Sequence, residues 1–166
     1  MIPFVLSVLL WSPRACAHVT VDPKSALAGH YEKLVFRVPH GCDGSPTVRL
    51  TVRIPEGVVS VKPQVHPGWK ITTKTAKYSK PIQLHGKEIQ EGVVEVTWAG
   101  GPLPDAFMDE FGMSVKLPDL PGHKLAFPAI QKCRHGTNEW TEEKSEGHGD
   151  AGKGLPAQSL QLAPGE

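Results

Sequence analysis

The residues with the clearest chemical potential lie where the first apolar segment meets the rest of the chain. Ala15 and Ala17 form the small-residue pattern after which a signal peptidase cuts, so cleavage would make His18 the first residue of the mature protein. The free α-amine and the Nδ1 atom of such a histidine close a chelate ring on one metal cation. The sequence therefore predicts a chelating group that exists only after processing.

Residues 1–17 have the features of a secretory signal peptide. Their apolar run, from Ile2 to Trp11, is far shorter than the roughly 20 residues that a membrane-spanning helix needs. No lysine or arginine precedes this run, which is atypical of a signal peptide. The alternative, a cytoplasmic protein with an apolar N-terminus, is opposed by the cysteine count. We expect removal of residues 1–17 and a periplasmic or secreted protein.

Cleavage would also remove Cys16 and leave two cysteines, Cys42 and Cys133. An even count in an exported chain predicts one disulfide. Closing a loop of about ninety residues would stabilise the fold by on the order of 4 kcal/mol. Two buried thiols and a pair of soft metal ligands are the alternatives. The disulfide is favoured because such widely separated cysteines lack the close spacing of thiolate metal motifs.

Short strands are predicted almost throughout the mature chain. Residues 47–54 alternate polar and apolar side chains, as a strand with one wet and one buried face does. Sixteen prolines and seventeen glycines interrupt the chain too often for long helices, and only Pro104 to Glu110 is a helical candidate. The sequence therefore predicts an all-β, antiparallel β-sandwich. The other expected strands are residues 34–38, 58–62, 69–75, 93–98, 113–117 and 124–130.

The chain divides into a signal peptide (1–17), one domain (18–143) and a C-terminal tail (144–166). The tail is rich in Gly and Pro, so we expect it to be mobile and outside the fold, although Ser159 to Leu162 would suit a short edge strand. Loss of Arg14 from 18 basic residues leaves 17 against 17 acidic ones, a balance that argues against nucleic-acid binding. After residue 17 no apolar segment is long enough to span a bilayer, so we expect no membrane span in the mature chain.

Five short motifs, at their spacing, resemble the YcnI-like family, also catalogued as the DUF1775 domain. The resemblance covers residues 18 to 142, which is essentially the whole predicted fold. It implies an extracytoplasmic copper-binding domain with a cupredoxin-like or immunoglobulin-like β-sandwich. The motifs are HVTV at 18–21, AGHYE at 28–32, VPHGC at 38–42, PGW at 67–69 and NEW at 138–140.

The resemblance also implies a site called a monohistidine brace. In it the processed His18 binds Cu(II) with help from Glu32, and Trp140 covers one face. This donor set suits Cu(II), which favours nitrogen and oxygen ligands. His30 lies two residues before Glu32, so on a strand it would face the same side and is a candidate extra ligand or supporting group.

The remaining histidines carry weaker predictions. His40 and His135 flank the two cysteines, so the disulfide would draw them together, although histidines beside turns are usually solvated. No H-E-x-x-H or G-x-S-x-G motif is present, so we expect neither a zinc protease nor an acyl hydrolase. The other histidines lie in loop-like contexts or in the tail: His66, His85, His123 and His148.

Three functions remain open from the sequence. The leading prediction is a non-catalytic Cu(II)-binding protein that sequesters copper or passes it to another protein of copper homeostasis. A copper-dependent oxidase or monooxygenase is the rival, and it would need a second histidine opposite His18 that the sequence does not identify. A metal-free protein-interaction β-sandwich is the third.

Overall fold

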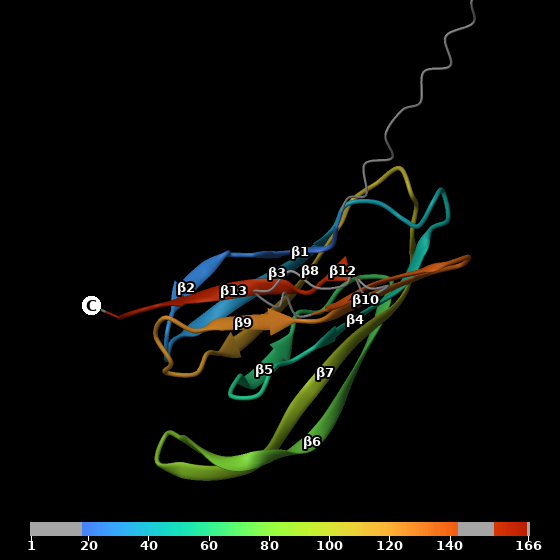
Figure 1. The fold of residues 1–166 in the computed structure, drawn as a ribbon. Helices are drawn as coiled ribbons and strands as arrows, with labels where there is room; N and C mark the ends of the chain where they lie inside the picture. The colour runs from blue at the N-terminus through green and yellow to red at the C-terminus, as the bar shows by residue number, and fades with distance from the viewer. Residues whose placement is uncertain (1–17, 143–154, 166) are drawn as a thin grey trace, which may run out of the picture.

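Two β-sheets face each other in this computed structural model, which describes residues 18–142 and 155–165 (Figure 1). The first sheet has the strand order β1-β3-β8-β5, and the second has the order β12-β11-β10-β4-β7-β6. The first consists of β1 (Thr20–Asp22), β3 (Tyr31–Val38), β5 (Val59–Pro63) and β8 (Asp109–Lys116). The second consists of β4 (Thr47–Arg53), β6 (Trp69–Leu84), β7 (Lys87–Leu103), β10 (Ala129–Cys133), β11 (Thr137–Glu142) and β12 (Leu155–Pro156).

The alternation of polar and apolar side chains builds the core between these sheets. In β4, Leu50 and Val52 are fully buried while Arg53 is exposed, as the period of two predicts. Across the sandwich, the rings of Trp98 on β7 and Phe111 on β8 have centroids 5.6 Å apart. Each large apolar side chain buried in this way stabilises the fold by about 1.5–3 kcal/mol. The all-β sandwich prediction is confirmed.

The predicted helix at Pro104 to Glu110 is wrong. Phe107 donates its N–H to the carbonyl of Pro104 (3.1 Å) in a turn, and the chain enters β8 at Asp109. Pairing with β3 makes residues 109 and 110 part of a strand rather than a helix, because Phe111 and the apolar residues that follow it on β8 face the core. Tertiary pairing here outweighs the local preference for a first helical turn.

The C-terminal segment corrects the predicted boundary at residue 144. A third sheet, in the order β2-β13-β9, is built from β2 (Ser25–Leu27), β9 (Lys124–Phe127) and β13 (Gln158–Ala163). Leu160 and Leu162 on β13 are fully buried, so the end of the chain belongs to the fold. The strand suggested at Ser159 to Leu162 is real, but it lies in the middle of its sheet rather than at an edge. His148 and the rest of residues 143–154 lie outside the described residues.

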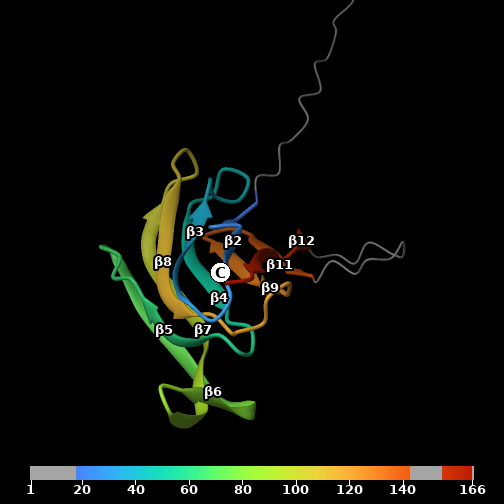
Figure 2. The ribbon, with the colours of Figure 1, turned by 90° about the vertical axis from the view of Figure 1, so that its left-hand side faces the viewer.

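A long hairpin formed by β6 and β7 projects from the sandwich (Figures 1 and 2). Both strands extend well beyond the predicted segments 69–75 and 93–98. The turn at its tip uses positive φ at His85 (49°) and Gly86 (73°), as two-residue hairpin turns require. The tip touches the first sheet, because the Tyr31 hydroxyl and His85 Nε2 are 3.0 Å apart.

Candidate metal centre

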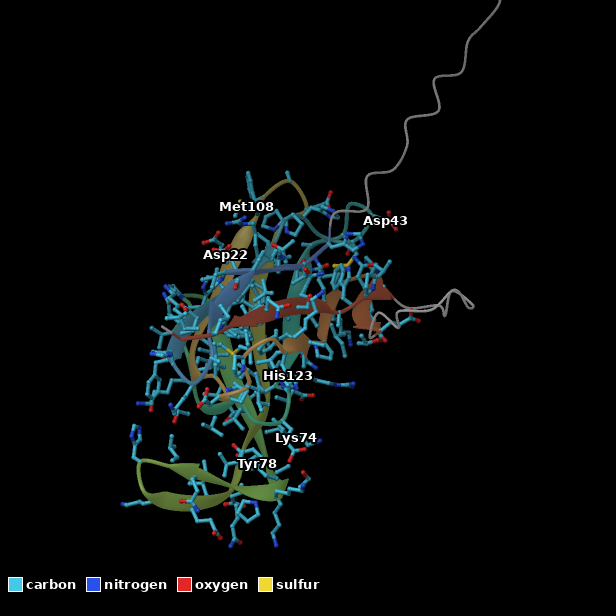
Figure 3. The ribbon with its side chains drawn as sticks, turned by 60° about the vertical axis from the view of Figure 1, so that its left-hand side comes forward. Asp22, Asp43, Lys74, Tyr78, Met108 and His123 are labelled. Carbon is cyan, nitrogen blue, oxygen red and sulfur yellow. A yellow bond between two sulfur atoms is a disulfide. The ribbon has the colours of Figure 1, made fainter. Side chains whose placement is uncertain are left out.

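One end of the sandwich gathers the chain start of the described fold and two loops. These loops are residues 39–46, which follow β3, and residues 104–108, which precede β8. Figure 3 shows Asp43 and Met108, one from each loop, on either side of this upper end, whereas Tyr78 lies far away on the β6–β7 hairpin. We call this region the His18 end.

His18 and Trp140 are brought together at the His18 end. Strand β1 pairs antiparallel with β3, with Thr20 opposite Arg37. Continuing this register by two residues puts His18 opposite Pro39. From the other sheet Trp140 on β11 approaches, with its ring centroid 6.4 Å from that of His18 and the two planes at 64°. Two of the expected site residues, far apart in the sequence, are therefore neighbours in space.

Trp140 is only 1% exposed, and within the described part of the chain its Nε1 has no hydrogen-bond partner, as is also true of Trp98 Nε1 in the core. A buried donor without a partner is costly, so such groups call for an explanation. The ring meets that of the half-buried His18 in an edge (T-shaped) contact. This arrangement suits a cation held by His18 and shielded from water by Trp140.

Glu32, by contrast, is not brought to His18. It lies near the start of β3, opposite Val115 on β8, and its Oε1 accepts a hydrogen bond from the N–H of Lys33 (3.0 Å). His18 is level with position 39, seven residues further along the strand, which corresponds to roughly 23 Å at the rise of a strand. The register therefore separates Glu32 from His18, whereas the predicted site has both on one metal.

His30 is also at the far end of β3. Its Nδ1 lies 2.8 Å from the carbonyl oxygen of Ala28, and its carbonyl accepts a hydrogen bond from the N–H of Leu117 (2.9 Å). A Cβ added at Gly165 would come within 3.9 Å of its ring, which places His30 beside the C-terminal end of the fold. His30 therefore lies just before β3, at the end of the strand where Glu32 lies, and both are distant from His18 along the strand.

The predicted disulfide between Cys42 and Cys133 is present in the structure and joins loop 39–46 to the end of β10. Within the loop, Cys42 and Ser45 exchange backbone hydrogen bonds of 2.9 Å in both directions. His135 donates its backbone N–H to the hydroxyl of Ser45 (2.9 Å), while its side chain stays exposed. The bridge therefore draws the two histidine-bearing loops together and fixes loop 39–46.

A buried polar network lies beneath loop 39–46, and the sequence reasoning missed it. Gln131 on β10 is 1% exposed, and its Nε2 donates to the His40 carbonyl and to the Thr47 hydroxyl, both at 2.7 Å. Asn138 donates to Gln131 Oε1 (3.3 Å) and to Cys42 Sγ (3.5 Å). The available signal was the amide at an inward position of the strand.

His66 already has a carboxylate partner. Its Nε2 is 2.8 Å from Asp109 Oδ2, and its ring packs 4.7 Å from Phe111 and 6.1 Å from Trp69. Within residues 18–142 and 155–165, no three His, Cys, Asp or Glu side chains are close enough to hold a metal ion together. A centre at the His18 end therefore needs a donor other than these side chains.

Comparison with known proteins places the chain among bacterial relatives. The family described as a domain of unknown function (DUF1775) matches residues 18–162. The copper-binding protein CutI of Bacillus subtilis (strain 168) is 28% identical over 141 residues, a match that covers 83% of this chain. The same match spans 62% of the length of CutI, so the relative is considerably longer than the shared region.

A solved structure shares the fold. It is an uncharacterized protein from Nocardia farcinica, described as having an immunoglobulin-like fold, and it is 27% identical to this chain. The match has a TM-score of 0.65 and covers 88% of this chain and 98% of that protein. In the described part of this chain, no helix is long and apolar enough to cross a membrane.

Proposed function

This chain belongs to the DUF1775 family, and from that premise we propose that it is an exported copper-binding protein. The name of its relative CutI supports copper as the ligand, and the wider role we propose is copper homeostasis, by sequestration or by transfer to another protein. Binding rather than catalysis is the activity proposed, because that relative is named for binding.

The site we propose is centred on a processed N-terminal His18. Cleavage after Ala17 would free the α-amine, which is the donor that the described side chains do not supply. The amine and imidazole would then hold Cu(II), which prefers nitrogen and oxygen ligands. The observation that carries this proposal is the position of His18, the first residue of the described fold, beside the buried Trp140. Their ring centroids are 6.4 Å apart.

Trp140 is proposed to cover the site. A tryptophan is a poor metal ligand, but its buried ring removes water from one side of His18 and restricts where the imidazole can turn. Because Trp140 is held by pairing with Ala129 in the centre of the second sheet, it does so from a rigid base. Exclusion of water on that side would strengthen the hold on a charged ion.

An N-terminal extension tests the proposal most directly. One extra residue before His18 moves the free amine out of the chelate ring while leaving the imidazole and Trp140 in place. Calorimetric titration with Cu(II) should show tight binding by the mature protein and a loss of at least about a hundredfold in affinity on extension. Mass spectrometry of the exported protein should find His18 at the N-terminus.

The matched control is the extended protein after a specific protease has removed the extra residue. Affinity should return to that of the mature protein, which rules out damage from the extension itself. Equal affinities for the mature and extended proteins would contradict the N-terminal site.

A further inference from the structure

The separation of Glu32 from His18 leaves the proposed copper site in need of another side-chain donor. We propose that His40 supplies it, as a second imidazole on the ion held by His18. This inference rests on the proposed function and identifies the ligand set of the same site. It departs from the predicted set, in which a carboxylate accompanies one histidine.

Position along β3 is the first argument. The register that pairs Thr20 with Arg37 puts His18 opposite Pro39, and His40 is the next residue in the chain. Residues directly opposite on antiparallel strands have Cα atoms about 4.5–5.5 Å apart, so this register puts Pro39 beside His18, and His40 follows in the loop beyond β3. Its side chain is 34% exposed, which leaves the ring accessible to an incoming ion.

The hydrogen bonding of the His40 ring is the second argument. Its Nδ1 lies 2.6 Å from the carbonyl oxygen of Gly41, which can only accept a hydrogen bond, so Nδ1 is the donor and, in the neutral ring, Nε2 has the free lone pair. The carboxylate of Asp105 lies 4.0 Å from the same Nδ1. Metal-binding histidines are typically oriented in this manner, with one ring nitrogen donating to a carbonyl or carboxylate and the other facing the ion.

The anchoring of the His40 backbone is the third argument. Its carbonyl accepts a 2.7 Å hydrogen bond from Gln131 on β10. Two residues earlier on the same strand, Ala129 pairs with Trp140. One central strand therefore positions both the covering indole and the His40 loop. At Gly41 a Cβ would lie 2.0 Å from the Ser45 carbonyl oxygen, so the loop closes tightly just after His40.

The other histidines are less suited to the role. His30 lies at the opposite end of β3, and His66 directs Nε2 at Asp109 (2.8 Å). His135 is exposed in the neighbouring loop, and the contact that it makes with loop 39–46 is through its backbone N–H, which donates to the Ser45 hydroxyl. His40 combines proximity, a free ring nitrogen and a fixed backbone. Together with the amine and imidazole of His18 it would give the nitrogen-rich set that Cu(II) favours.

The test uses the mature protein beginning at His18, with Cu(II) as the probe. His40→Ala should weaken Cu(II) binding by about a hundredfold in calorimetric titration, since changes to mere supporting groups already cost up to that much. Electron paramagnetic resonance should show one coordinated nitrogen fewer. The matched control is His135→Ala, which removes an exposed imidazole from the adjoining loop and should leave both affinity and spectrum unchanged.

Folding is monitored by thermal melting without copper. Gln131 contacts the His40 backbone rather than its ring, so His40→Ala should melt as the unmodified protein does. His40→Gln, which keeps the volume and polarity of the side chain, serves as the second variant and should lose the same nitrogen signal. Unchanged affinity and spectrum in a folded His40 variant would overturn the inference.

The two proposals fail in different ways. If extension before His18 abolishes tight binding but both His40 variants bind normally, the N-terminal site stands and His40 is not a ligand. If the extension has no effect while the His40 variants lose affinity, the N-terminal site fails and ligation by His40 stands.

Discussion

The two ends of β3 carry similar candidate metal ligands, but only one end lies beside His18. Glu32 lies near the start of the strand with His30 just before it, and His40 lies just beyond its end. Only the second group is level with His18, because β1 pairs with the later half of β3. The comparison shows that a cluster of donor residues in the sequence becomes a site only where strand register brings a partner to it. At about 3.3 Å per residue, one strand of ordinary length is enough to separate two such clusters.

The first prediction concerns the disulfide that anchors loop 39–46, which contains His40. Cys42→Ser opens a loop closed by residues 91 apart in sequence, and stability should fall by on the order of 4 kcal/mol because the unfolded chain gains entropy. Chemical denaturation without reductant measures this loss. Affinity of the remaining folded protein for Cu(II) should change little, because Gln131 still holds loop 39–46.

The double variant Cys42→Ser with Cys133→Ser is the control, since it removes the thiol left unpaired by the single change. Both should lose similar stability. Loss of copper binding with stability intact would instead identify Cys42 as a ligand.

A second change weakens the His40 end without touching its covalent bond. Gln131→Leu removes the donor to the His40 carbonyl and leaves that oxygen without this partner, at a cost of about 1–3 kcal/mol in stability. If His40 is a ligand, Cu(II) affinity should also fall by about tenfold, as expected when a supporting group is lost. Parallel denaturation and calorimetry separate the two effects. Reduced stability with unaltered affinity would show that the network supports only the fold.

The smallest effect is expected at the other end of β3. Glu32→Gln keeps the shape of the side chain and removes its charge. Because position 32 is roughly 23 Å along the strand from the level of His18, Cu(II) affinity should stay within about twofold. Calorimetric titration at fixed ionic strength measures it. A drop of tenfold or more would restore Glu32 as a ligand and contradict the register as the basis of the site.

Much of the fold was predictable, because it depends on local alternation and on cysteine count. The strand at residues 47–54 and the Cys42–Cys133 bridge were both foreseen. Strand β13 was foreseen only as a short edge strand in a tail outside the fold, since a Gly- and Pro-rich composition gave no sign that Leu160 and Leu162 would be buried by partners from β2 and β9.

The site was only half predictable for a related reason. The contact of His18 with Trp140 followed from the family resemblance, and the structure shows those two rings side by side. The separation of Glu32 from His18 was not predicted, because the register between β1 and β3 is a long-range property, set by which faces are buried rather than by spacing along the chain. Gln131 went unnoticed because its partners come from the distant loop 39–46 and from Thr47.

The long outer strand of the β6–β7 hairpin has a consequence for self-association. As the last strand of its sheet, β6 exposes unpaired backbone groups along much of its length, and such edges can recruit strands from other molecules. Its exposed side chains include Lys74, Lys77 and Lys80, and Pro81 has no N–H to offer. The pairing with β7 also breaks register between Lys77 and Ile82. Repelling charges, a missing donor and an irregular edge together oppose pairing of β6 with a strand of another copy, so we expect this exposed edge not to promote aggregation.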